Sequence, residues 1–310
     1  MALPEGRLVP WKGYAERLAH GTEEGNTLCC SHSWSVWRCE IWTEGLFSLL
    51  FWALGFLESS VGRAEERFLI DWTDERILFH GSGQLGYSSN AWNHFFEQPG
   101  GDPPKLKEKL GECQEAGRLK IVVRFGPPWF QKFGEFRGAD EGDGPFREIK
   151  GGRLDEATAE LGRQAVRRWV RVRPAILHRA EEWLNEHSEG GRRLAVHLRR
   201  TDKLEQCRSN DLPLPEILSQ ILAFCRSLEC SSVLLCTDDA TMKKELWRQL
   251  HLVGLETYTF DALLSIGGPS HKDENLDRRR NAEDVLVEVL LMSRCHALLS
   301  TSGSWRVQQC

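Results

Sequence analysis

Features by which membrane, metal-binding and nucleic-acid-binding proteins are usually recognised are absent from this chain. Its longest apolar run, 45–57, is shorter than the roughly 20 residues that a membrane-spanning helix needs, and the first residues have no apolar core of a signal peptide. The ten cysteines show no paired CxxC spacing of a zinc site. A net charge of -5 and a pI near 6.1 argue against a protein that mainly coats nucleic acid. We expect no membrane span, no metal and no nucleic-acid partner.

The common nucleotide and hydrolase motifs are missing as well. There is no P-loop, no GxGxxG after a strand and no HExxH. No Asn-x-Ser/Thr acceptor is present, so glycosylation gives no sign of a secretory route, and the residues do not indicate a compartment. With 310 residues, 41% of them hydrophobic, the chain is long enough to bury a core in two ordinary domains or one large one.

Periodicity predicts an α/β protein. A buried helix is expected at 43–59, strands at 67–72 and 118–125, and helical structure at 155–187, whose Arg-rich stretch 167–173 we interpret as a solvated helix side. Strands and helices then alternate, as in a doubly wound parallel sheet; the expected elements are 193–199, 214–228, 232–239, 241–253, 255–260, 281–294 and 296–302. The predicted organisation is a poorly ordered or peripheral N-terminus (1–42), an N-terminal lobe (43–190) and a C-terminal Rossmann-type lobe (191–310).

Three expected strands of the C-terminal lobe end in polar clusters: "VHLRRTDK" (196–203), "LLCTDD" (234–239) and "LLSTSGS" (298–304). Ligands of open parallel sheets bind beyond the carboxyl ends of the strands, where helix N-termini also point. The coincidence of three polar strand ends therefore predicts a ligand site at this edge of the sheet.

Side chains alternate along a strand, so His197 and Arg199 are expected on one face, opposite Leu194, Val196 and Leu198. A guanidinium offers a planar fork of donors that suits phosphate oxygens, and a histidine adds another hydrogen bond. A structural ion network is the alternative.

In that alternative Arg199 pairs with Asp238 or Asp239 from the neighbouring strand end. The residues alone leave both interpretations open.

Glu288 lies in "VLVEVLLM", within an otherwise apolar helix, one turn after Asp284. A lone carboxylate there is costly unless it is paired or bound to a ligand. A ligand contact and a buried salt bridge are both open for Glu288.

These motifs together resemble the GDP-fucose-dependent fucosyltransferases, the superfamily of the alpha-1,6, nodulation and protein O-fucosyltransferases. The resemblance rests on "VHLRRTDK" (196–203), "CTDD" (236–239) and "DVLVEVLLMSRCHALLSTSGS" (284–304), with a weaker match in the N-terminal half, and spans roughly 43–304. It implies a GT-B-like fold of two Rossmann-like lobes, and an inverting, metal-independent transfer of fucose from GDP-fucose to a glycan or protein hydroxyl. It also implies the Golgi or secretory pathway.

By this resemblance Arg199 neutralises the leaving diphosphate, which suits a reaction without a metal. Lys203 matches the family's lysine and is expected to orient the catalytic base. The family's base is a glutamate whose counted position here is Cys207, while Glu205 lies close by but out of register. The donor-binding residues implied are His197, Arg199, Arg200, Asp202, Asp238, Asp239, Glu288, Ser302, Gly303 and Ser304.

The sequence also departs from the family pattern at its end. Trp305 stands where a polar residue is expected, and the chain stops before the helix that should cover the far side of the donor pocket. We therefore expect either a truncated C-terminal lobe or a protein that binds without turnover.

Two other functions compete with a transferase. One is a non-catalytic nucleotide-sugar or glycan-binding descendant of the same fold. The other is a Mg-dependent phosphotransferase using Asp238 and Asp239, which the lack of a phosphate-cradling loop before a helix disfavours.

Overall fold

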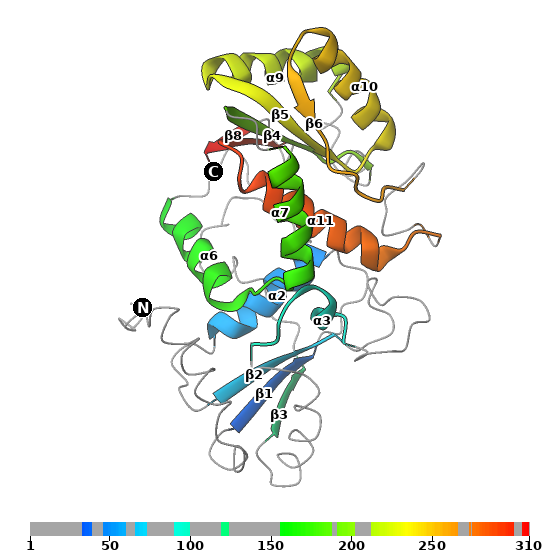
Figure 1. Cartoon of the computed structure of the whole chain (residues 1–310). Helices are drawn as coiled ribbons and strands as arrows, with labels where there is room; N and C mark the ends of the chain where they lie inside the picture. Colours follow the sequence, from blue (N-terminus) through cyan, green and yellow to red (C-terminus); the bar gives the residue numbers. More distant parts are fainter. Residues whose placement is uncertain are drawn as a thin grey trace, which may run out of the picture. The chain divides into compact units, whose positions relative to one another are not determined.

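The computed structural model consists of two compact units (Figure 1). The first contains Met1–Arg147 and Gly152–Arg173, and the second contains Glu148–Gly151 and Pro174–Cys310. The structure describes residues 33–38, 46–59, 66–72, 90–99, 119–123, 156–187, 191–201, 212–265, 273, 275–300 and 306–309. None of the helices within these ranges is long and apolar enough to cross a membrane.

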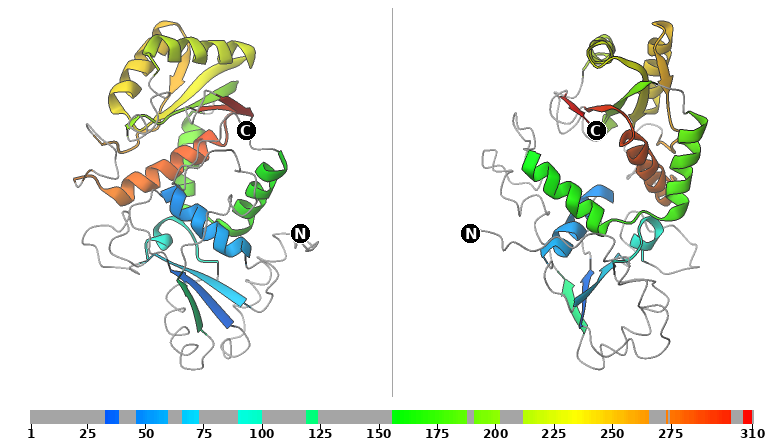
Figure 2. Two further views of the ribbon diagram at one scale, coloured as in Figure 1. Left: turned by 180° about the vertical axis from the view of Figure 1, so that it is seen from behind. Right: turned by 60° about the vertical axis from the view of Figure 1, so that its left-hand side comes forward.

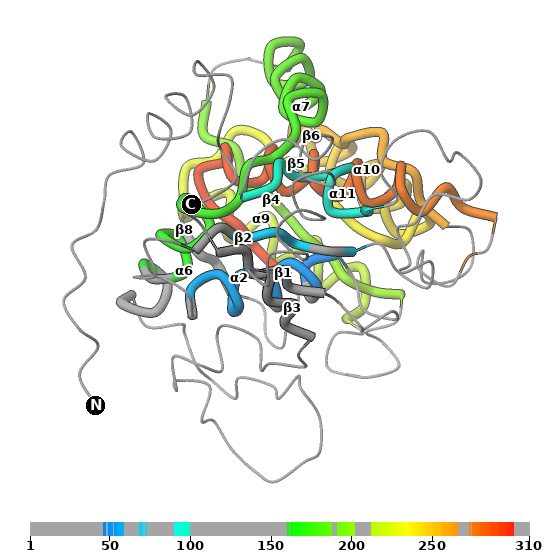
Figure 3. The backbone as a smooth tube through the Cα atoms, turned by 90° about the horizontal axis from the view of Figure 1, so that it is seen from below, coloured from blue at the N-terminus to red at the C-terminus, as the bar shows by residue number. Residues whose placement is uncertain are grey.

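The first unit is built on a parallel sheet of three strands in the order β2-β1-β3 (Figure 1). Figure 3 shows the same chain from below. The strands are β1 (Ser33–Arg38), β2 (Glu66–Asp71) and β3 (Leu119–Val123). The strands predicted at 67–72 and 118–125 are confirmed as β2 and β3. The central strand β1 was not predicted and lies within residues 1–42, for which the sequence indicated no element. Its identity as a strand depends on pairing with β2 and β3, which are distant in sequence.

Helix α2 (Leu46–Ser59) confirms the predicted buried helix. It is apolar on nearly all sides, so it is stable only when surrounded by protein, and Leu49, Leu54 and Leu57 are fully buried. Its Glu58 accepts hydrogen bonds from the guanidinium of Arg168 at 3.0 Å and the indole of Trp169 at 2.7 Å. This contact joins α2 to helix α6 (Glu156–Trp169).

Two buried amides complete the edge of β2. The side chain of Asn90 accepts from the backbone N–H of Trp72 at 3.0 Å and donates to the carbonyl of Ile70 at 2.7 Å. Gln98 accepts from the N–H of Ile70 and donates to its carbonyl, both at 2.9 Å. These bonds satisfy strand groups that would otherwise be buried without a partner. The segment between the amides contains the short helix α3 (Trp92–Phe95).

The second unit contains a five-stranded sheet in the order β6-β5-β4-β7-β8. The strands are β4 (Arg192–Leu198), β5 (Cys230–Thr237), β6 (Glu256–Tyr258), β7 (Ala297–Ser300) and β8 (Arg306–Gln309). The first four strands in this order are parallel, and β8 is antiparallel to β7. The expected parallel α/β sheet is confirmed, whereas β8 was not predicted.

Helices cover both faces of this sheet (Figures 1 and 2). Helices α9 (Leu214–Ser227) and α10 (Ala240–Leu252) cover one face, and α7 (Pro174–Glu186) and α11 (Arg278–Met292) lie on the other. The apolar core lies under α9 and α10 and includes Leu194, Val196, Leu198, Val233, Leu235, Ile217, Ile221, Leu246 and Leu250. The predicted alternation of β4 is therefore confirmed for its core-facing residues.

The helical region predicted at 155–187 is divided into α6, which ends at Trp169, and α7, which begins at Pro174. Proline restricts the residue before it to extended conformations and fits the first turn of a helix, so a new helix begins there. Helix α7 packs on α11 and clusters with the second unit. The division between the units therefore falls at Arg173/Pro174, whereas the sequence pattern had suggested a boundary near residue 190.

Candidate functional site

The candidate site lies at the carboxyl ends of β4 and its neighbours. The chain runs from β4 through β5 to β6 on one side, and then crosses to β7 on the other side of β4. The strand order thus reverses between β4 and β7, and in open α/β sheets ligands bind at such a switch point. His197 on β4 is the register partner of Ser300 on β7 and of Cys236 on β5. The topology therefore places His197 beside the position where a ligand is expected.

Asp238 organises the turn that follows β4. Its carboxylate accepts the backbone N–H of Arg200 at 2.7 Å and the hydroxyl of Thr201 at 2.6 Å. Two longer contacts of 3.4 Å join it to the backbone N–H of Thr201. The sequence resemblance places Asp238 in the donor site, and in the structure its carboxylate holds this turn.

Arg199 also pairs with Asp238, its Nε lying 3.4 Å from Oδ2. The ion pair that was the alternative interpretation of Arg199 is therefore present. The Arg199 side chain is 44% exposed, however, and ion pairs that are open to water are worth only about 0–1 kcal/mol. An anionic ligand can take over such a contact at little cost.

Asp239 caps the first turn of α10, accepting the backbone N–H of Met242 at 2.9 Å. One of its carboxylate oxygens, Oδ2, lies 3.6 Å from Nε of Arg200, whose side chain is only 11% exposed. Asp239 and Arg200 thus connect the turn after β4 to the start of α10.

His197 is partly buried next to this charge cluster. Burial lowers the pKa of its imidazole, Asp238 opposes the shift, and Arg199 adds to it. A neutral imidazole has one ring nitrogen that donates and one that accepts a hydrogen bond. His197 is thus suited to bind a polar ligand by hydrogen bonding and not by charge.

Glu288 lies on α11 and is 6% exposed. Burial raises the pKa of its carboxyl to about 7, with Asp284 and Asp238 adding to the shift and Lys243 and the Cys236 thiol opposing it. Its Oε1 is buried and accepts no hydrogen bond from the described part of the chain. A buried carboxyl oxygen without a hydrogen bond is costly in such a setting.

The buried salt bridge that was the alternative for Glu288 is made by Asp284 instead. Asp284 is 1% exposed, pairs with Arg179 of α7 and with Arg280 at 3.0 Å, and accepts the backbone N–H of Leu263 at 2.8 Å. Two guanidinium groups and a peptide N–H compensate the charge of Asp284. It therefore connects α7, α11 and the chain after β6.

The remaining predicted site residues lie outside the part of the chain that the structure describes. They are Asp202, Lys203, Glu205, Ser302, Gly303 and Ser304, together with Cys207 at the counted position of the base. The described part of the predicted site is thus formed by β4, β5 and α11.

Lys243 and Cys236 were not predicted as site residues. Lys243 on α10 donates to the carbonyl of Phe260 at 2.6 Å, and its charge lowers the pKa of Glu288. The only sequence feature that pointed to Cys236 was its position directly before "TDD". Its alternation with Leu235 along the strand shows only that the two side chains lie on opposite faces of the sheet. No group of three or more potential metal ligands occurs among the described residues.

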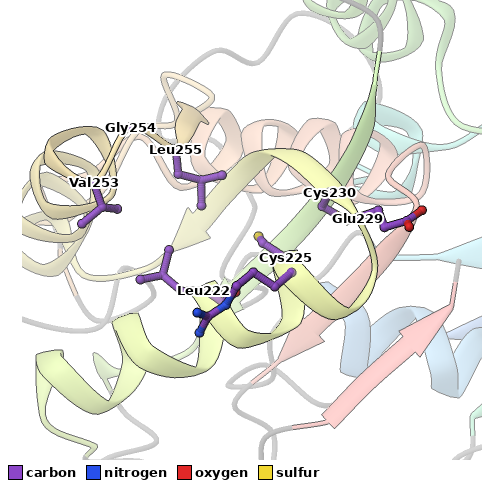
Figure 4. A pocket seen from close by; sticks show the side chains of 8 residues that line it. Leu222, Cys225, Glu229, Cys230, Val253, Gly254 and Leu255 are labelled. Carbon is purple, nitrogen blue, oxygen red and sulfur yellow. The ribbon is translucent and has the colours of Figure 1, made fainter.

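A pocket of about 430 Å³ lies at the other end of β5 from Asp238 (Figure 4). It is lined by Leu222, Cys225, Arg226, Glu229, Cys230, Val253, Gly254 and Leu255. None of these belongs to the predicted site, because they surround the amino end of the strand and the site lies at the carboxyl end.

No protein-family model matches the chain, and no curated protein sequence is significantly similar to it. Among solved structures, the fucosyltransferase NodZ from Bradyrhizobium has a TM-score of 0.46 and 15% identity, covering 90% of this chain and 98% of that chain. POFUT1 in complex with GDP has a TM-score of 0.43 and 12% identity, covering 88% and 92%. A variant of Arabidopsis thaliana FUT1 in complex with GDP has a TM-score of 0.47 and 11% identity, covering 93% and 69%. The chain is thus similar in structure to these fucosyltransferases, and at this identity the similarity assigns no residue a role.

Proposed function

We propose that this protein is a GDP-fucose-dependent glycosyltransferase of the GT-B class, which transfers fucose with inversion to a hydroxyl of a glycan or protein. The observation that carries the proposal is the placement of His197 and Arg199 at the end of β4, at the topological switch point of the sheet. This is where a nucleotide diphosphate meets the sheet in Rossmann-like domains.

In this reaction the acceptor oxygen attacks the anomeric carbon from the face opposite the diphosphate. The bond from that carbon to the phosphate oxygen breaks, and GDP leaves with the electron pair. Arg199 exchanges its contact with Asp238 for the diphosphate and stabilises the charge that develops there. His197 adds a neutral hydrogen bond, and Asp238 keeps the turn of Arg200 and Thr201 in place.

The hydroxyl proton needs a base. Glu205 is the candidate nearest to the family position, with Lys203 as the cation that orients it. Asp202, Ser302, Gly303 and Ser304 complete the proposed donor site around the diphosphate. No metal is required, because Arg199 neutralises the leaving group.

Calorimetric titration with GDP tests the binding part of the proposal. We expect the wild type to bind GDP equally with and without EDTA, and Arg199→Ala to weaken binding by about 10- to 100-fold, the loss of one charge-assisted contact. Arg199→Lys should recover part of the affinity. Arg248→Ala on α10, where Arg248 pairs with Glu245 at 2.7 Å on the surface, is the matched control and should bind like the wild type. Binding that needs Mg²⁺ would instead indicate the phosphotransferase.

Release of GDP from GDP-fucose in the presence of candidate acceptors tests turnover. The second candidate function, a non-catalytic nucleotide-sugar-binding protein, is favoured by Cys207 at the counted position of the base. Binding of GDP-fucose without acceptor-dependent release of GDP would support that second function and refute the transferase.

A further inference from the structure

The pocket at the amino end of β5 is a cavity that the proposed donor site does not use. It lies wholly within the second unit, between the carboxyl-terminal ends of α9 and α10. Its volume of about 430 Å³ is within the range of about 300–1,000 Å³ that is usual for small-molecule sites. A water molecule takes about 30 Å³ of the liquid, so the pocket has room for roughly a dozen non-hydrogen atoms.

The walls of this pocket are apolar. Leu222 on α9 and Leu255 before β6 point toward each other across it (Figure 4). Cys225 and Cys230 are buried, and burial raises the pKa of both thiols, so they stay protonated and act as small apolar groups. Val253 also lines the pocket and is half exposed, so a ligand can enter from solvent. These walls favour a ligand with an apolar body.

Arg226 places a positive charge beside these walls. Its Nε donates to the carbonyl of Leu222 at 3.2 Å, which holds the guanidinium along α9 at the pocket. Its two Nη groups make no hydrogen bond or ion pair with any residue that the structure describes. Glu229 lines the pocket as well, but its carboxylate points away from Leu222 and pairs with Arg192 at 3.5 Å (Figure 4). Among the described lining residues, one positive charge is thus left uncompensated.

The helix ends beside the pocket do not cancel this charge. The carboxyl-terminal end of a helix favours cations through its free carbonyl groups. In the last turn of α10, however, carbonyls accept the N–H groups of Val253, Gly254 and Leu255 at 3.3, 3.0 and 3.1 Å. At the end of α9 the N–H of Leu228 donates to the carbonyl of Phe224 at 2.9 Å. The Nη groups of Arg226 are therefore the donors that a ligand can use.

The acidic side chain that follows the lining residue Leu255 faces elsewhere. Glu256 shares a face of β6 with Tyr258, because side chains alternate along a strand. The ring of Tyr258 packs on Trp183 of α7, on the opposite side of the sheet from α9 and α10. Glu256 therefore lies on the α7 side and does not repel an anion in the pocket.

We infer that this pocket binds a small organic anion, with its apolar body between Leu222 and Leu255 and its carboxylate on the guanidinium of Arg226. A guanidinium presents two parallel donors that match the two oxygens of a carboxylate. Decanoate has this chemistry and about this size. The inference does not rest on the proposed function, because the pocket lies at the amino end of β5 and the donor site at its carboxyl end.

Calorimetric titration of the full chain with decanoate, below the concentration at which it forms micelles, tests the inference. We expect saturable binding at one site, and decylammonium, which has the same chain and the opposite charge, should bind at least about 10-fold more weakly. Arg226→Ala should weaken decanoate binding by about 10-fold, the loss of one charge-assisted contact that is open to water, and Arg226→Lys should recover part of it. Arg248→Ala, which removes an exposed arginine of α10 outside the pocket, is the matched control and should bind like the wild type.

Gly254 allows the charge preference to be tested from the opposite wall. It lines the pocket, and a Cβ there would meet no described atom within 4 Å. Its φ of +77° is tolerated best, after glycine, by asparagine and aspartate. Gly254→Asp should bind decanoate about fivefold more weakly than Gly254→Asn, which has the same shape without the charge, and decylammonium should show the reverse order.

A bulky substitution tests the location. Leu222→Trp fills the pocket and should abolish decanoate binding. Leu218→Trp is the matched control, because Leu218 lies one turn earlier on α9 and packs against the core without lining the pocket. Urea unfolding checks that both variants are folded, and the exposed Arg226 variants give the same test without a change in the core.

The inference is overturned if the wild type does not bind decanoate, if decylammonium binds equally well, or if folded Arg226→Ala and Leu222→Trp both bind like the wild type. Self-association of the wild type that Leu222→Trp abolishes, without decanoate binding, would show that the pocket is an interface between copies and would overturn it as well. Titration with GDP decides the proposed function separately, since none of these variants changes a residue of the donor site.

Discussion

Replacing Asp238 tests whether the turn after β4 depends on a single carboxylate. In Asp238→Ala the N–H of Arg200 and the hydroxyl of Thr201 lose the carboxylate that accepts their hydrogen bonds at 2.7 and 2.6 Å in the wild type. Hydrogen bonds to charged groups contribute about 1.5–3 kcal/mol each, and the loss is partly offset because water reaches this half-open position. The contact with Arg199 adds little, since that side chain is 44% exposed. We expect Asp238→Ala to lower the free energy of unfolding by about 3 kcal/mol.

Asp238→Asn separates geometry from charge. The amide oxygen can still accept from Arg200, and the amide nitrogen can donate to the Thr201 hydroxyl, which is able to accept. We expect a loss of about 1 kcal/mol, that of replacing charged by neutral hydrogen bonds. Asp261→Ala removes an exposed aspartate and should stay within about 0.5 kcal/mol of the wild type.

Urea unfolding followed by tryptophan fluorescence measures all three variants. A loss below about 1 kcal/mol in Asp238→Ala, or equal losses in the alanine and asparagine variants, would refute the assignment of Asp238 as the acceptor that holds this turn.

Two further predictions concern the stability of the second unit. Gly254 has a φ of +77° and closes α10, its N–H donating to the carbonyl of His251 at 3.0 Å, and a Cβ at this position would meet no described atom within 4 Å. Gly254→Ala should therefore lower the free energy of unfolding by about 1 kcal/mol through backbone strain alone. Urea unfolding measures this loss, and an unchanged stability would contradict the role of backbone strain. Because burial raises the pKa of Glu288 to about 7, the folded state holds a proton that the unfolded chain releases near its ordinary value of 4.5. This stabilisation, about 3 kcal/mol, is complete below pH 4.5 and is lost as the pH rises through 7. Glu288→Gln should flatten that part of the curve of unfolding free energy against pH, and a curve unchanged by the substitution would show that Glu288 titrates normally.

The local hydrophobic pattern was sufficient to predict the elements whose pattern lies entirely within their own residues. The unbroken apolar character of α2 and the alternation of β4 each predict one structure, because burial of those side chains is possible in only one way. β1 and β8 were missed for the opposite reason: each becomes a strand through partners elsewhere in the chain. The buried amides Asn90 and Gln98 were missed likewise, since their partner, the edge of β2, is 20 and 28 residues away from them.

The candidate site divides in the same way. The order of residues was enough to show which residue types follow the strands, and the alternation of β4 placed His197 and Arg199 on one face, because side-chain direction along a strand is a local property. Which of these side chains pair with one another is determined only by the tertiary structure. In the folded chain Asp238 holds the turn of Arg200 and Thr201, and the buried salt bridges belong to Asp284. These pairings depend on distances between elements that the chain brings together only on folding, and no spacing along the sequence contains them.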